Sequence, residues 1–311
     1  NPGACIIIET IDLKSFLNTL TSGQGLFGEL GNIKELNSFN WKLKFLTDLL
    51  NKPEYKQLLS EGSAVISLHP DDNHKLHLLF SAAVPGTMTI RQIKELLRAT
   101  GAKELIDIRN GDGRILKIPY VYNNLNDTVF ISLYSGLLLC SASEALIREA
   151  VSTAISGKDI RSLDGFLRVF LTSGKREDKV FVVFKNLKPL FDPLLLKQAP
   201  GISEKIAKLA DIAAGDIYIS EGGIILSGYT ESLESKQIVH RYKSVSPKEF
   251  NTYKILPSST VLFETAIRPS EGEMTFGKNA GSATITGFCN KLHSFLGDEI
   301  SKVCLDLRGR P

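Results

Sequence analysis

Hydrophobic residues along the chain fall into short strand-like runs and into segments with helical spacing. β-Branched residues fill the run 5–11, and Asp12 follows as the N-cap of a helix that carries Phe16, Leu17 and Leu20 on one face. Paired strand-like runs with turn residues between them then recur, at 63–68 with 75–83, 105–108 with 115–121, 128–133 with 137–140, and 216–220 with 224–228. This pattern predicts β-hairpins, whose two strands are antiparallel.

Segments with helical spacing separate these hairpins. Thr89 and Ser143 are candidate caps for two of them, and the prolines at 189 and 193 are expected to interrupt another segment. The expected helices span 90–100, 144–156, 162–171 and 203–214. Because strands come mostly in antiparallel pairs with helices between the groups, we predict an α+β fold of mainly antiparallel sheets with helices packed on them.

Two pairs of segments in the chain resemble each other. Residues 130–146 align without a gap to 217–233, sharing a turn glycine (Gly136, Gly223), an apolar strand and a helix cap. Residues 12–20 resemble 186–194, and each of these follows an apolar strand. The recurrence of both pairs in one order favours a degenerate internal duplication over convergence on common hairpin sequences. We therefore expect a first α+β unit at 1–157, a second, shorter related unit at 158–255, and at 256–311 either the start of a third unit or a C-terminal extension of the second.

Composition excludes several classes of protein. Of 311 residues, 43% are hydrophobic and 23% are charged, which is ordinary for a globular protein and excludes a disordered or collagen-like chain. The formal net charge of +3 is too small to indicate a nucleic-acid-binding surface. No uninterrupted apolar run approaches the ~18–20 residues of a membrane-spanning helix.

The four cysteines argue against a metal site, and the first residues bear on location. Cys5, Cys140, Cys289 and Cys304 form no CxxC pair, which argues against zinc or iron–sulfur spacing, and we expect them to be buried small hydrophobes. The sequence starts at Asn1 without a Met, and a removed secretory signal or N-terminal membrane anchor would account for this.

The densest group of potential metal ligands lies around one hairpin turn. His74 and His77 are three residues apart and face opposite sides of a strand, whereas His69 with Asp71 and Asp72 could converge with His74 across the turn. His69, Asp71, Asp72 and His74 are thus the candidate ligands. A solvated hairpin tip explains the same residues, so we expect no tightly bound metal there.

Motifs for other chemistry are missing from the sequence. There is no Gly-x-Ser-x-Gly elbow and no phosphate-binding loop, and 110–113 lacks the later ligands of a calcium loop. No catalytic or cofactor-binding residue is therefore predicted. Tyr120 and Tyr122 alternate along a strand and are candidates for a partner-binding strip, the alternative being a half-buried sheet face.

A family resemblance rests on several of these segments. They are Pro2 with the strand 6–9 that leads into Leu13 and Phe16, the segment 120–122, the segment 129–146, and 256–260. In these segments the chain resembles an uncharacterised family of exported bacterial proteins with an N-terminal membrane anchor. The resemblance implies a periplasmic or cell-surface location and says nothing about chemistry.

Two functional hypotheses follow. The first is an extracytoplasmic interaction or structural module without catalytic activity. Its partner would be a protein or a cell-envelope component, not a nucleic acid, and it would meet the membrane only through the removed N-terminal segment. The alternative is a small-ligand-binding protein or hydrolase whose site assembles from distant residues. A deep apolar pocket with convergent polar groups would favour the alternative, and a shallow surface with a hydrophobic patch would favour the module.

Overall fold

The computed structural model describes residues 3–21, 43–44, 47–48, 51–52, 63–71, 75–99, 102–110, 113–122, 125–172, 178–195, 201–220 and 223–243. The chain divides into two compact units, Asn1–His240 and Arg241–Pro311. Every described strand lies in the first unit.

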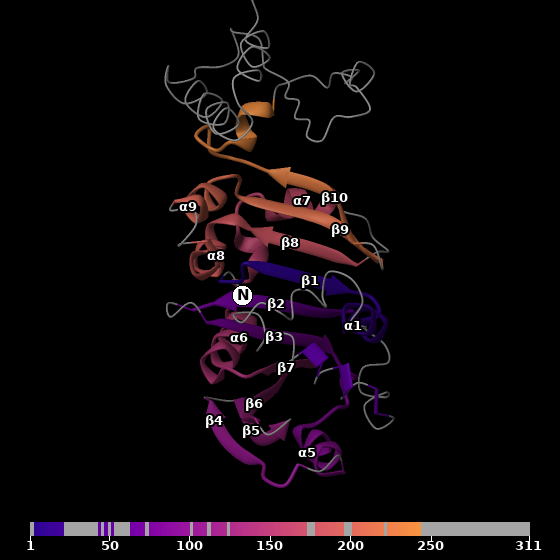
Figure 1. Ribbon diagram of the computed structural model, residues 1–311. Coiled ribbons are helices and arrows are strands. Elements are labelled where there is room, and N and C mark those ends of the chain that lie inside the picture. Colours follow the sequence, from indigo (N-terminus) through magenta and orange to yellow (C-terminus); the bar gives the residue numbers. More distant parts are fainter. Residues whose placement is uncertain are drawn as a thin grey trace, which may run out of the picture. The chain divides into compact units, whose positions relative to one another are not determined.

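The first unit is built on one antiparallel sheet, and the predicted α+β class is confirmed. The strands are β1 (Ile6–Thr10), β2 (Ala64–Pro70), β3 (Leu76–Ala83), β4 (Ile106–Asn110), β5 (Gly113–Tyr122), β6 (Leu125–Tyr134), β7 (Leu137–Ser141), β8 (Lys179–Val183), β9 (Ile212–Ser220) and β10 (Gly223–Glu231). They follow the order β10-β9-β8-β1-β2-β3-β7-β6-β5-β4, which Figure 1 shows from top to bottom. Each predicted hairpin is present. Strand β1 lies inside the sheet, where it pairs with β8 on one side and with β2 on the other.

Helices cover both faces of this sheet. They are α1 (Leu13–Thr21), α5 (Ile90–Ala99), α6 (Glu144–Ser156), α7 (Phe166–Thr172), α8 (Lys188–Leu195) and α9 (Ile202–Ala207). The short 3-10 turns η1 (Ile160–Ser162), η2 (Phe184–Asn186) and η3 (Val239–Tyr242) lie in connections. Successive strand residues point to opposite faces, so Ile8 packs toward α1 and Ile6 toward α8 and α9, while Ile7 packs against α7. In the same way Leu138 contacts α5 on the first face and Leu139 contacts α6 on the second.

The helix starts agree with the caps read from the sequence. The Asp12 carboxylate accepts a hydrogen bond from the Ser15 N–H (3.0 Å), and Ser143 Oγ accepts one from the Leu146 N–H (3.3 Å). Each acceptor satisfies a backbone donor that has no partner inside its helix. Local chemistry therefore fixes where these helices begin.

The sequence expectations for 186–214 were wrong in two places. The expected helix 203–214 ends with α9 at Ala207, and Ile212 instead begins β9, paired with Val183 on one side and Glu231 on the other. The apolar spacing of 206, 209 and 212 suited a helix, but strand pairing on both sides decides the outcome. Pro189 and Pro193 lie inside α8 instead of interrupting it, and Pro189 is in the first turn, where the N–H that proline lacks would have no partner inside the helix.

The predicted equivalence of two hairpins is also wrong. Gly136 lies in the two-residue turn between the paired residues Tyr134 and Leu137, at φ +76°, whereas Gly223 is itself paired with Ser220 at the start of β10. Strand β7 leads into α6, but residues 232–243 after β10 contain no α-helix and form only η3. The gapless alignment of 130–146 with 217–233 thus joins residues with different structural roles.

The segment from β1 to β3 and the segment from β8 to β10 have the same order of secondary-structure elements. A strand, helical structure and a hairpin follow one another as β1, α1, β2 and β3, and again as β8, α8, α9, β9 and β10. In each case the first strand pairs with the first strand of its hairpin. Strands β1 and β8 pair antiparallel around Ile7 and Phe181, and these residues lie equally far before Asp12 and Asn186, which the sequence alignment had matched.

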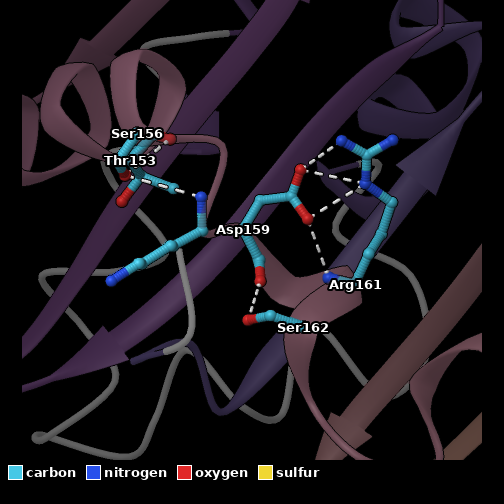
Figure 2. A network of polar contacts seen from close by, with 6 residues as sticks. Thr153, Ser156, Asp159, Arg161 and Ser162 are labelled. Atoms are coloured by element: carbon cyan, nitrogen blue, oxygen red, sulfur yellow. Dashed lines mark hydrogen bonds and ion pairs between the residues drawn. The ribbon is translucent and has the colours of Figure 1, made fainter.

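The division into units remains a prediction. Strands from the expected units 1–157 and 158–255 share one continuous sheet, and residues 256–311 lie outside the described part of the chain. The expected boundary falls where Gly157, in the left-handed conformation, ends α6. Figure 2 shows the connection that follows: the Asp159 carboxylate accepts hydrogen bonds from the backbone N–H and the guanidinium of Arg161, and Ser162 Oγ donates to the Asp159 carbonyl (2.6 Å). The hydrogen bond from Arg161 lowers the pKa of the Asp159 carboxyl.

Candidate interaction surface

The two edges of the sheet differ in length and charge. Strand β4 has five residues, among them Asp107 and Arg109, and Asp107 forms an ion pair with Lys94 of α5 (Nζ–Oδ2 2.5 Å). Strand β10 has nine residues and carries no charge before Glu231 at its end. Short, charged edge strands are a common protection against pairing with other chains. Strand β4 has this protection and β10 lacks it.

Apolar side chains are exposed around the unprotected edge. Tyr218 of β9 is 65% exposed, and its cross-strand partner Ile225 on β10 is 61% exposed. Tyr229, four residues after Ile225 on β10, is exposed on the same face, and Leu226 is exposed on the opposite face. A strand that covers the core buries at least one of its faces, whereas residues 225–230 are exposed on both.

Helix α7 extends this exposed surface. It packs on β9 and β10 through the face that holds Phe166 and Val169, and its residues Leu167, Phe170 and Leu171 are exposed. We call Tyr218, Ile225, Tyr229, Leu167, Phe170 and Leu171 the apolar surface. Isolated exposed apolar residues are normal in proteins, whereas a group of them on one helix and two neighbouring strands is a candidate interaction surface.

Charged groups run across the sheet beside the apolar surface. Lys179 of β8 is buried, with its Nζ 5.4 Å from the centre of the Phe170 ring, and its strand neighbours are Glu9 and Asp216. One carboxylate oxygen of Asp216, Oδ1, is buried and has no hydrogen-bond partner among the described residues. Asp216 and Tyr218 point to the same face of β9, so this acceptor lies at the margin of the apolar surface.

The candidate metal ligands are only partly brought together. His69 and His77 are cross-strand partners in the β2–β3 hairpin, and His77 Nε2 lies 3.1 Å from Asp71 Oδ2. Asp72 and His74 lie outside the described residues. Within the described ranges, no group of three or more His, Cys, Asp or Glu residues could hold a metal ion. The expected absence of a tightly bound metal stays a prediction.

His69 makes a contact that the sequence did not indicate. Its Nε2 lies 2.9 Å from Ser67 Oγ, which is the spacing of a nucleophile and its base. Both residues are only 6% exposed, and Ser67 Oγ also contacts the Leu79 carbonyl oxygen. Burial lowers the pKa of His69 to about 4. A general base needs a pKa near neutrality and access to substrate, and this pair, two residues apart on the same face of β2, has neither.

The remaining candidates lie within strands. Tyr120 and Tyr122 belong to β5, where they pair with Asp127 and Leu125 of β6, and their side chains are outside the described part of the structure. Burial raises the pKa of the Cys5 thiol to about 11 and that of Cys140 to about 12, so both are poor nucleophiles at neutral pH.

The apolar surface was not found from the sequence. The sequence predicts 224–228 as an ordinary hairpin strand, because apolar residues in a strand usually face a core. The one available signal was the absence of charge from 223 to 230, which is unusual for an edge strand but also typical of a central one. Sequence alone does not say which strand forms the edge.

None of the described helices is long and apolar enough to cross a membrane.

Comparison with other proteins adds no family assignment. No protein-family model, curated protein or solved structure matches the chain.

Proposed function

We propose that this protein is a non-catalytic interaction module that binds a protein or cell-envelope component through the apolar surface and the β10 edge. The observation that carries this proposal is the group of exposed apolar residues on β9, β10 and α7, next to an edge strand without charge protection. Burying such residues against a partner contributes roughly 25 cal/mol per Å² of apolar area. The proposed contact involves neither nucleic acid nor a cofactor.

The proposed location is outside the cytoplasm, in the periplasm or at the cell surface, with an N-terminal anchor in the full-length protein. The resemblance of segments 6–17, 120–122 and 129–146 to exported, anchored bacterial proteins supports this location. An anchored module that acts by contact needs an exposed binding surface and no catalytic groups, which agrees with the burial of the Ser67–His69 pair.

We also propose a degenerate internal duplication, with β2–β3 as the counterpart of β9–β10. The repeated order of strand, helical structure and hairpin supports it, as does the pairing of β1 with β8 around Ile7 and Phe181. In this comparison β10 corresponds to β3. The outer edge of β3 is hydrogen-bonded to β7, whereas among the described strands β9 is the one neighbour of β10.

Site-specific photo-crosslinking in the producing cell tests the proposed function. A photoreactive amino acid at Tyr218 should give a discrete covalent adduct with a partner. The matched control is Ile155 on α6, which is 63% exposed and lies outside the apolar surface, and it should give no such adduct. Equal yields at both positions, or no adduct at Tyr218, would refute the proposal. Turnover of a substrate by the purified chain, abolished by Ser67→Ala, would refute the absence of catalysis.

A further inference from the structure

The outward-facing backbone groups of β10 can be assigned from the hydrogen bonds of its neighbour. The Ile217 N–H of β9 donates to the Asp178 carbonyl on the β8 side (2.9 Å). Strand groups alternate in direction, so Asp216 and Tyr218 direct their backbone groups toward β10, where they pair with Ser227 and Ile225. The N–H and C=O groups of residues 224, 226, 228 and 230 therefore point away from β9, to an edge that pairs with no other described strand.

An antiparallel second copy of β10 fits this edge when the pairing is centred on Ser227. Ser227 is the middle residue of β10, so this register pairs all nine residues of the strand with the second copy. Ile225 then lies opposite Tyr229 of the second copy on one face, and Leu226 lies opposite Gly228 on the other. Apolar–aromatic cross-strand pairs stabilise sheets, and a glycine leaves room for the leucine side chain.

The charges permit the same register. Glu231 is the one charged residue of β10, and in this pairing it lies opposite Gly223 of the second copy, far from the other Glu231. By contrast, β4 carries Asp107 and Arg109 within five residues and engages Asp107 with α5, which leaves it less suited to self-pairing. The asymmetry between the edges therefore selects β10.

From these observations we infer that two copies of this chain associate through antiparallel β10–β10 pairing, which would make one continuous sheet across the dimer. The inference rests on the proposed function, because it names the partner of the same surface. The twofold axis passes through Ser227, and the residues flanking it, Ile225 and Tyr229, bury each other on the side of the apolar surface.

Two measurements on the full chain test this inference. Sedimentation equilibrium should give a mass twice 34.2 kDa at tens of micromolar protein. Oxidation of a Ser227→Cys variant should link most chains into dimers, because directly opposed strand residues have the Cα spacing of a disulfide. The matched control, Thr230→Cys on the same strand, should gain no cross-link over the parent chain, because its two copies would lie roughly 20 Å apart in this register.

Charge variants test the register itself. Ile225→Lys with Tyr229→Lys places two lysines opposite each other at both ends of the pairing, and we expect at least a tenfold weaker dimer. Ile225→Lys with Tyr229→Glu places opposite charges there and should restore dimerisation. Circular dichroism identical to that of the parent chain confirms that each variant is folded.

The results separate this inference from the proposed function. A monomeric parent chain, with no Ser227→Cys dimer, overturns self-pairing. If the photo-crosslink at Tyr218 then joins a different protein, the interaction module stands with another partner. If Tyr218 is cross-linked neither to a second copy of this chain nor to a different protein, both proposals fail together.

Discussion

Acid should destabilise this protein through His69. The imidazole is 6% exposed, and burial lowers its pKa from the ordinary 6.5 to about 4. As the pH falls below 6.5, an unfolded chain takes up the proton while the folded chain does not, so the unfolded state gains in relative stability. The stabilisation is complete above pH 6.5 and is lost progressively down to about pH 4. The whole shift corresponds to about 3 kcal/mol of unfolding free energy, of which about 2 kcal/mol is lost by roughly pH 4.5.

The comparison of parent chain and His69→Gln isolates this effect from other titrating groups. Glutamine keeps a polar contact for Ser67 Oγ and does not ionise, so the variant should lose about 2 kcal/mol less than the parent chain between about pH 7 and about pH 4.5. Urea unfolding at both pH values measures the difference directly. In thermal unfolding the same energy corresponds to roughly 4–8 °C in Tm.

A matched control comes from the residue across the hairpin. His77 pairs with His69 in the β2–β3 register but is half-buried and contacts Asp71. His77→Gln should therefore retain most of the parent chain's extra loss of stability in acid. If His69→Gln and the parent chain lose the same free energy, within about 0.5 kcal/mol, the argument from burial of His69 is wrong.

Three further predictions concern packing, thiol chemistry and a helix cap. Gly228→Ala should destabilise the fold by about 1–3 kcal/mol, because the added Cβ would lie 2.0 Å from a backbone carbonyl oxygen of β9, whereas Gly86→Ala, with nothing within 4 Å, should change urea unfolding little. In the folded protein, Cys5 and Cys140 should resist iodoacetamide at about pH 8, since fewer than roughly one in a hundred are thiolates; peptide mapping that finds either one labelled before unfolding would contradict this. Ser143→Ala should cost about 1 kcal/mol in thermal or urea unfolding, and threonine at the same position should restore most of it.

Local sequence determined the hairpins and the helix starts. The Ser135-Gly136 pair sits at φ 48° and 76°, and this left-handed conformation is what a two-residue turn requires. Asp12 and Ser143 cap their helices by contacts within three residues. Such features depend on a few neighbouring residues, so they can be read without knowing the rest of the fold.

Tertiary structure decided what these elements become. Residues 206, 209 and 212 have helical spacing, but Ile212 begins a strand because β9 pairs with β8 on one side and with β10 on the other. The candidate interaction surface depends on strand order in the same way. Ile225 and Ile7 belong to similar apolar runs, yet Ile7 is 8% exposed in a central strand and Ile225 is 61% exposed at an edge. An apolar strand has the same sequence wherever it lies in a sheet, so only the fold determines whether its side chains meet the core or solvent.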